Sequence, residues 1–165
     1  MIAAARHVLL YCRARDRAEI EAVVGYERAA GEMLEPWLNG AVLAKLFEYQ
    51  ATPAVLVVAY EVTARTVSLS MIATCHWRHV ALGVAKWAKR ECMPELLARG
   101  YRRAECRAIE GHADAQAFLK FLGFTLECRC PEYGRGGETF LQYAWRSKDH
   151  VLHAENSTAA ASGSA

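Results

Sequence analysis

The sequence lacks any long apolar run and any strong excess of one charge. Its most apolar tract, Ala54 to Tyr60, is far shorter than the roughly 20 residues that a membrane-spanning helix needs. The 20 basic and 18 acidic side chains are interleaved and leave a formal net charge of +2. Neither a membrane nor a nucleic acid is therefore predicted as a partner. No signal peptide pattern opens the chain, so we expect an intracellular protein.

Motifs for metal ions and for disulfides are also missing. The six histidines are scattered without HxxxH or HExxH spacing. Cys128 and Cys130 flank one residue of an expected strand, which places both side chains on the same face without CxxC spacing or a second ligand pair. An even number of cysteines indicates disulfides mainly in small secreted chains. We predict buried free thiols and no metal site.

What the sequence does contain is enough apolar material for one sizeable core. The chain has 165 residues, of which 53% are hydrophobic, and a chain of this size forms one domain as a rule. We predict a single domain over residues 1–146. Residues 147–165 are rich in Ala and Ser and cannot bury apolar surface, so we expect a flexible tail there.

The first third of the chain indicates helices. After the apolar run Val8 to Cys12, Asp16 and Glu19 resemble a capping box, with Asp16 as N-cap and Glu19 bonding back to it. The helix that follows is predicted to end at Gly31. The segment Leu34 to Leu38 contains a proline and is expected to be a connection.

A second short helix and a strand pair are predicted next. The helix rests on apolar residues at helical spacing, namely Val42, Leu43, Leu46 and Phe47. Ala54 to Glu61 and Thr66 to Thr74 are rich in β-branched and apolar residues, which favours two antiparallel strands. Their near-continuous apolarity indicates that helices cover both faces.

The second half of the chain has a clearer order of elements. Pro94 lacks an N–H and crowds the carbonyl four residues earlier, so we expect it to interrupt a helix. The predicted order is a helix from Val80 to Arg99, a strand containing Ala104, Cys106 and Ala108, a helix from Ala113 to Leu122, and two strands, Phe124 to Cys130 and Thr139 to Trp145, joined by the Gly-rich loop Pro131 to Glu138.

Two short motifs in this order suggest a family. Val80-Ala-Leu-Gly83-Val-Ala85 opens the helix, and Leu122-Gly123-Phe124 closes the next one. Small residues of this kind let a backbone approach a pyrophosphate at a helix N-terminus. The stretch from Thr66 to Trp145 resembles the GNAT N-acyltransferases. The resemblance implies an α/β fold, with a mixed sheet flanked by helices and ended by an antiparallel hairpin, and acetyl-CoA bound at Leu82, Gly83, Val84 and Ala85.

The sequence departs from the family pattern at positions that carry chemistry. Val80 stands where the family has Gln or Arg, and Leu119 stands where many members have a tyrosine that protonates the leaving thiolate. His112 stands where an asparagine is often found. A leucine cannot donate a proton, so we expect catalysis to be inefficient or absent. The catalytic candidates are few: Glu61, Glu110 and His112, with His76 as a further titratable neighbour.

A narrower resemblance covers the same stretch. It rests on Trp77, Gly83 to Lys86, Gly111 with His112, and Phe118 to Lys120. These motifs resemble the small GNAT-like internal virion proteins of short-tailed bacteriophages, which also have Leu in place of the tyrosine. This resemblance implies assembly with other virion proteins, and a location in the cytoplasm of a bacterial host cell or in the virion.

Two hypotheses about function follow. The first is a virion or assembly component with a degenerate acetyl-CoA site, and the second is an active acetyl-CoA-dependent N-acetyltransferase. The second predicts a V-shaped opening between the strands that end near Thr74 and Ile109, with the N–H groups of Leu82 to Ala85 free to face it. The first is compatible with an opening filled by Trp77 or Arg78.

Overall fold

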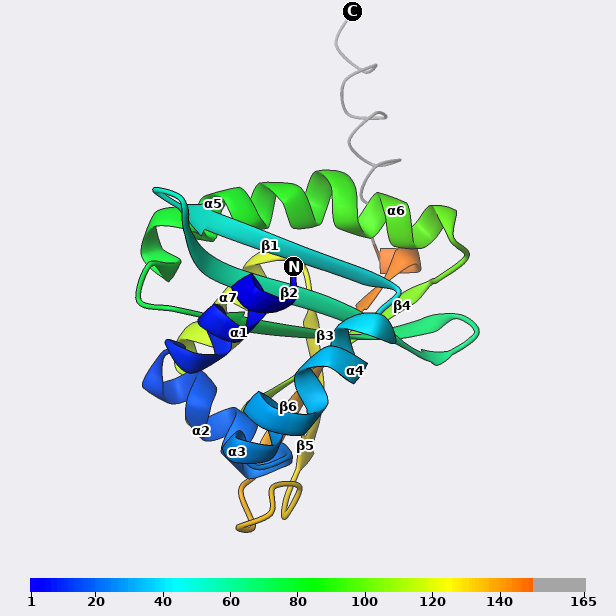
Figure 1. Ribbon diagram of the computed structural model, residues 1–165. Helices are drawn as coiled ribbons and strands as arrows, with labels where there is room; N and C mark the ends of the chain where they lie inside the picture. Colours follow the sequence, from blue (N-terminus) through cyan, green and yellow to red (C-terminus); the bar gives the residue numbers. More distant parts are fainter. Residues whose placement is uncertain (150–165) are drawn as a thin grey trace, which may run out of the picture.

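One mixed sheet forms the centre of the protein (Figure 1). The computed structural model describes residues 1–149, and in this part of the chain six strands have the spatial order β1-β2-β3-β4-β6-β5. They are β1 (Leu43–Tyr49), β2 (Thr52–Thr63), β3 (Thr66–Ala73), β4 (Arg103–Ile109), β5 (Thr125–Cys130) and β6 (Phe140–Arg146). Strands β3 and β4 are parallel, and the other neighbours are antiparallel.

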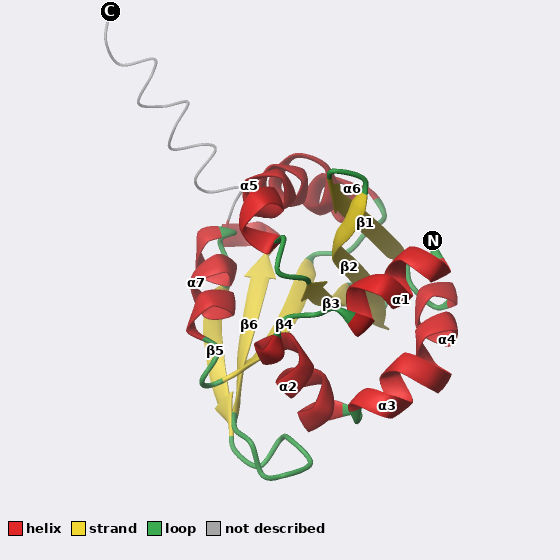
Figure 2. Cartoon of the chain, turned by 60° about the vertical axis from the view of Figure 1, so that its left-hand side comes forward, coloured by secondary structure: helices red, strands yellow, loops and turns green. Residues whose placement is uncertain are grey.

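Helices cover both faces of the sheet. Figure 2 shows α5, α6 and α7 on one side and α1 to α4 on the other. The first group is α5 (Trp77–Trp87), the π-helical turn η2 (Ala88–Cys92), α6 (Met93–Ala98) and α7 (Ala113–Phe121). The second group is α1 (Ile2–Leu10), α2 (Ala14–Val23), α3 (Tyr26–Arg28), the π-helical turn η1 (Ala29–Met33) and α4 (Leu34–Asn39).

The predicted α/β fold, with a mixed sheet between helices and a final antiparallel hairpin, is confirmed. Strands β5 and β6 form the hairpin, and β6 lies between β5 and β4. The interruption predicted at Pro94 is also present, because the π-helical turn η2 ends two residues before it. A π-turn widens the helix locally, which is one way to accommodate the missing N–H of proline.

The N-terminal helices differ from the prediction. Residues Ile2 to Leu10 form α1, where only a short apolar run was expected. Helix α2 begins at Ala14 with the extended residue Arg13 before it, and it ends at Val23 instead of Gly31. The capping box is therefore wrong. Asp16 lies inside the helix, and its carboxylate bonds to the side chain of Arg13 and to the N–H of Ala73 in β3 instead of to a backbone N–H at the helix start.

The predicted second helix is also wrong, because its residues form the edge strand β1. Leu43 and Phe47 pack on the α5 side of the sheet, whereas Leu46 packs on the α1 side. A strand with both faces covered does not alternate between apolar and polar residues. The apolar residues of β1 therefore happen to have the spacing that is typical of a helix. The expected connection Leu34 to Leu38 is helix α4, whose first turn tolerates Pro36.

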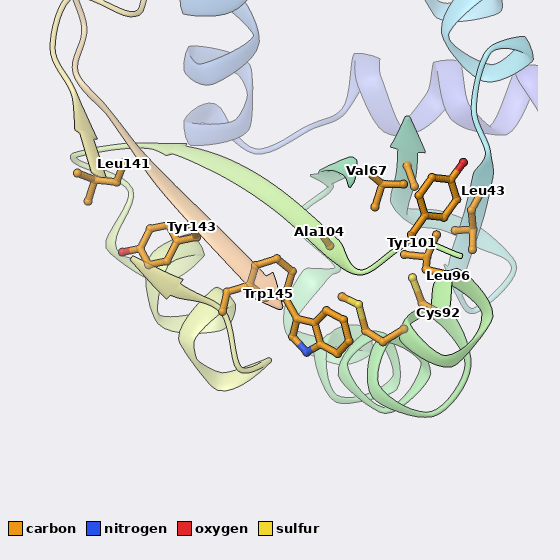
Figure 3. Packing of buried hydrophobic residues seen from close by; sticks show 12 residues of the cluster. Leu43, Val67, Cys92, Leu96, Tyr101, Ala104, Leu141, Tyr143 and Trp145 are labelled. Atoms are coloured by element: carbon orange, nitrogen blue, oxygen red, sulfur yellow. The ribbon is translucent and has the colours of Figure 1, made fainter. Parts of the chain in front are cut away.

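The largest core cluster lies where α6 and η2 cover the closed part of the sheet (Figure 3). Ala104 of β4 is buried at its centre, and Tyr143 and Trp145 of the neighbouring β6 pack around it. Leu96 and Cys92 close the cluster from the helix side. A small residue on the central strand thus leaves room for the two large aromatic side chains of β6.

Some expectations concern parts that the structure describes only in part. The predicted flexible tail from residue 147 to 165 lies outside the described residues except for its first three positions. The division into one domain and a tail remains a prediction. Within residues 1–149, no helix combines the length and the apolarity that crossing a membrane requires. No group of three or more potential metal-binding side chains was found among these residues either.

All six cysteines are free thiols, but they are not all buried as predicted. Cys75 and Cys128 are exposed, and Cys92 is fully covered beneath η2. The Sγ atoms of Cys128 and Cys130 are 3.6 Å apart, in agreement with the predicted common face. Strand β5 lies at the edge of the sheet, so its residues receive less cover than the sequence pattern indicated.

This difference in burial predicts a difference in thiol reactivity. Burial raises the pKa of the Cys92 thiol to about 12, so only about one molecule in 10⁴ carries the reactive thiolate at pH 8. We expect N-ethylmaleimide at pH 8 to label Cys75 and Cys128 in the native protein, and Cys92 only after unfolding in guanidinium chloride. Peptide mapping by mass spectrometry measures this. Labelling of native Cys92 as fast as Cys75 would contradict the packing of η2.

Candidate functional site

The parallel strands β3 and β4 separate after a short paired region. Thr66, Val67 and Ser68 pair with Arg103, Ala104 and Glu105, and no pairing follows. Beyond this point β3 remains paired only with β2, and β4 remains paired only with β6. The sheet therefore contains a V-shaped opening between the end of β3 and the end of β4, as expected from the sequence for the strands ending near Thr74 and Ile109.

A cavity of about 280 Å³ lies at this opening. Its lining comes from both faces of the sheet, so the cavity passes between the strands. On one side the lining residues belong to α5, η2 and α7, and include Val84, Trp87, Ala88, Phe118 and Leu119. On the other side they belong to α2, α4 and the loop before α7, and include Asp16, Glu19, Ile20, Val23, Trp37 and His112.

Backbone N–H groups face each other across the opening. The N–H of Ala73 bonds to Asp16 and that of Ile109 bonds to Glu19, so both groups point away from the neighbouring antiparallel strands. Alternate residues of a strand present their N–H groups to the same side. Met71 and Arg107, two residues earlier on their strands and beyond the last β3–β4 pair, therefore direct their N–H groups into the opening.

Helix α2 bridges the two strands at the wide end of the opening. Asp16 Oδ2 accepts a hydrogen bond of 3.0 Å from the N–H of Ala73, at the end of β3. One turn later, Glu19 Oε1 accepts a bond of 2.8 Å from the N–H of Ile109, at the end of β4. Arg13 neutralises Asp16 through two bonds of 2.8 and 2.9 Å. Two acidic residues on one face of a helix thus hold the ends of the separated strands.

His112 is the buried titratable group of the site. It precedes α7, and only 2% of its surface is exposed. Its Nδ1 lies 3.0 Å from Glu19 Oε1, whereas its Nε2 is buried without a hydrogen-bond partner among the described residues. Of the predicted catalytic candidates Glu61, Glu110 and His112, it is the one that lines the cavity.

The two predicted acidic candidates lie elsewhere. Glu61 is exposed near the closed end of the sheet, where it accepts a hydrogen bond from the hydroxyl of Tyr101. Glu110 forms a two-point ion pair with Arg129 on the surface. The hydrogen bonds from Arg129 hold the pKa of the Glu110 carboxyl below its usual range, which makes it a poorer base. Neither carboxylate reaches the opening.

The predicted acetyl-CoA turn lies farther along its helix than expected. Helix α5 begins at Trp77, so Leu82 to Ala85 lie beyond its first turn, where an α-helix bonds the backbone N–H groups internally. The expectation that these N–H groups are free is therefore wrong. Val84 lines the cavity, and Gly83 is exposed with open space beside its Cα. The first turn of α5 instead presents Arg78 and His79 at the surface.

The side chains proposed to fill the opening do not lie in it. Trp77 packs edge-on against Phe118, with a distance of 4.8 Å between ring centroids, and Arg78 bonds to His79 on the surface. Neither residue lines the cavity. Leu119 does line it, so the apolar side chain that stands in place of the family's tyrosine faces the same space as His112.

Sequence reasoning missed the role of α2. The spacing of Asp16 and Glu19 places both carboxylates on one face of a helix, and this signal was assigned to a cap. The same spacing serves here to bind two strand ends from more than 50 residues away. Only the tertiary arrangement distinguishes the two uses.

Comparison with known proteins supports the fold. No family model and no curated protein matches the sequence. Among solved structures, a protein of Desulfovibrio desulfuricans assigned to the GNAT family of acetyltransferases is similar, with a TM-score of 0.64 and 18% identity over 88% of this chain and 92% of that chain. The ribosomal-protein-S18-alanine N-acetyltransferase of Escherichia coli has a TM-score of 0.60 and 16% identity, over 88% and 86% of the two chains.

A third similar structure contains acetyl-CoA. YncA of Salmonella typhimurium, assigned as an acetyltransferase and solved with its cofactor acetyl-CoA, has a TM-score of 0.65 and 14% identity, over 89% of this chain and 90% of that chain. These identities establish similarity of fold and not of activity. The chain has the GNAT fold, as the order of its elements predicted.

Proposed function

We propose that this protein is an acetyl-CoA-dependent N-acetyltransferase. The observation that carries the proposal is the opening between β3 and β4, which holds a cavity of about 280 Å³ and faces the N–H groups of Met71 and Arg107. Three proteins of similar fold are named or assigned as acetyltransferases, and one of them was solved with acetyl-CoA, which supports acetyl-CoA as the substrate.

The residues of the opening suit a thioester. Acetyl-CoA would supply an activated acyl group, whose carbonyl carbon is open to attack by an amine. Backbone N–H donors such as those of Met71 and Arg107 stabilise negative charge on a carbonyl oxygen, and they act more strongly where water is excluded. The apolar side chains Trp87, Phe118 and Leu119 line the space between α5 and α7 and exclude water there.

Leu82 to Ala85 remain the proposed contact for the rest of acetyl-CoA. His79 and Gly83 are one helical turn apart and lie on the same side of α5. With open space beside Gly83, a ligand chain can pass closely over the helix at this point. Arg78 and His79, exposed in the first turn, are positioned to meet the phosphate groups of the ligand.

The alternative is the virion or assembly role with a degenerate site. Its support is the set of short motifs around Trp77 and Phe118, together with the loss of the tyrosine at Leu119. The solved structures named above are acetyltransferases by name or assignment and supply no support for assembly. An open cavity that Trp77 and Arg78 leave free favours ligand binding over a purely structural role.

Thermal unfolding with and without acetyl-CoA tests the proposal. A ligand that binds only the native state raises the midpoint, by about 3 kcal/mol in free energy at one hundred times the Kd. We expect a clear rise for the native protein, and no rise for Gly83→Val, because the added side chain projects into the open space beside α5.

Gly31→Val is the matched control, since Gly31 is also exposed, helical and without neighbours within 4 Å of an added Cβ. It should keep the full rise. No rise in the native protein at millimolar acetyl-CoA would contradict the proposed function. An equal rise in Gly83→Val and the native protein would remove Gly83 from the binding site.

A further inference from the structure

We propose that Glu19 and His112 form a catalytic dyad in which His112 Nε2 takes the proton from the acceptor amine. The inference rests on the proposed function and adds the acid–base group that the sequence did not reveal. The two residues come from α2 and from the loop before α7, 93 positions apart, and both line the cavity. His112 is 98% buried, so bulk water does not hydrogen-bond to its ring in place of Glu19.

The hydrogen bonds of the dyad determine the tautomer of His112. Glu19 Oε1 is 3.0 Å from His112 Nδ1 and also accepts the N–H of Ile109. A carboxylate oxygen only accepts hydrogen bonds, so Nδ1 carries the proton. In the neutral ring, Nε2 then has a lone pair and no proton. Nε2 is buried and has no hydrogen-bond partner among the described residues, so its lone pair is not used by the protein, and His112 lines the cavity.

This arrangement differs from an ordinary helix cap. His112 precedes α7 but makes no side-chain bond to the helix end. Its one described partner is on another helix, and that partner also bonds to the last residue of β4. Glu19 is therefore a positioning residue, which holds the imidazole at the wide end of the opening.

The lining of the cavity indicates the class of acceptor. On the dyad side, α2, α4 and β3 contribute the apolar side chains Ile20, Val23, Trp37 and Ile72. Two arginines also line the cavity, Arg13 and Arg107, and Arg13 already pairs with Asp16. A second positive charge on the acceptor would meet these cations, while Asp16 is already paired with Arg13 and Glu19 is bonded to His112 and Ile109. The site fits a primary amine with one charge and a compact apolar body.

The proton balance of the transfer needs a single base. Nε2 takes one proton from the ammonium form of the acceptor and leaves the neutral amine. The amine nitrogen then forms a bond to the acyl carbon, and the bond between that carbon and sulfur breaks. The imidazolium returns its proton to the leaving thiolate, and the second proton of the nitrogen passes to solvent. Leu119 takes no part, so the imidazolium replaces the missing tyrosine.

The tautomer can be measured without any ligand. Long-range ¹H–¹⁵N spectra of the native protein, assigned by comparison with His112→Asn, should show His112 protonated at Nδ1 and bare at Nε2. A proton on Nε2 of the neutral ring would overturn the proposal, because no lone pair would then be available to the amine.

Kinetics with 2-phenylethylamine and acetyl-CoA test the chemistry. His112→Asn keeps a side-chain N–H for Glu19 but lacks Nε2, and it should lower kcat by at least 100-fold. Glu19→Gln should lower kcat about tenfold with little change in KM. His7→Asn is the control, since His7 lies on α1 and contacts the ring of Tyr11, outside the cavity, and it should leave kcat unchanged.

These measurements distinguish a failure of the dyad from a failure of the proposed function. An unchanged rise of the unfolding midpoint with acetyl-CoA in His112→Asn, together with the loss of kcat, supports the dyad. Restoration of the rate of His112→Gly by added imidazole supports it further, because a purely structural role would not respond. Full activity of His112→Asn would overturn the dyad while leaving acetyl-CoA binding intact. Preference for spermidine over 2-phenylethylamine would overturn the assigned acceptor class.

Discussion

Replacing Asp16 by alanine should lower the free energy of unfolding by about 3 kcal/mol. The carboxylate is 96% buried and bonds to the guanidinium of Arg13 and the N–H of Ala73. Its removal leaves a buried N–H without a partner and Arg13, itself mostly covered, without its counter-charge. Urea denaturation followed by circular dichroism measures the change.

Asp114→Ala is the matched control for this substitution. Asp114 also pairs with an arginine, Arg15, at 3.0 Å, but 72% of its side chain is exposed. Exposed pairs contribute little because water already stabilises both charges, so we expect a loss of at most about 1 kcal/mol. Equal losses for the two variants would mean that Asp16 does not hold α2 to the sheet.

Asp16→Ala should also impair ligand binding at the opening between β3 and β4. Asp16 attaches α2 to the end of β3, and Glu19 attaches it to the end of β4. Without the first bond, α2 has one attachment less to keep the strands at their separation. If the cavity binds acetyl-CoA as proposed, stability and ligand binding are coupled through one face of α2.

The second half of the chain could be predicted closely from its sequence. Its helices and strands alternate with clear ends, such as Gly100 and Gly123, which both adopt positive φ angles suited to glycine. Local signals and tertiary structure agree there. The resemblance to the GNAT family rested on this half, and the GNAT fold that it implied is confirmed.

The first half could not be predicted equally well. Strand β1 is covered on both faces and therefore lacks the alternation that identifies a strand. Pairing with β2 overrides the helical spacing of Leu43 and Phe47. Helix α1 has no side-chain cap, and α2 has none either, so the usual start signals are missing.

The site was predictable only in part. The position of the opening followed from the acetyltransferase hypothesis, and His112 was among the candidates because of its residue type. Its partner Glu19 could not be found, because the two are 93 positions apart and meet only through folding. The binding residues were assigned from a short motif, which placed the start of α5 three residues too late.

Two substitutions of alanine on β4 should have opposite effects and thereby locate the ligand. Ala104 and Ala108 are both buried on the α5 side of the same strand. Ala108 lines the cavity, whereas Ala104 lies in the closed core among Tyr143 and Trp145. Leucine at position 108 should therefore enter existing space, while leucine at position 104 should overpack the core and cost about 1–3 kcal/mol.

If acetyl-CoA places its thioester in the opening, Ala108→Leu should abolish the rise in unfolding midpoint while leaving the free protein as stable as before, or more stable. The physical reason is that the added methyl groups fill cavity volume that the ligand needs and gain apolar contacts at the same time. Ala104→Leu should show the reverse, a less stable protein that still responds to acetyl-CoA. A full response in Ala108→Leu would place the ligand outside the opening, because a leucine at this position and an acyl group cannot share the same part of the cavity.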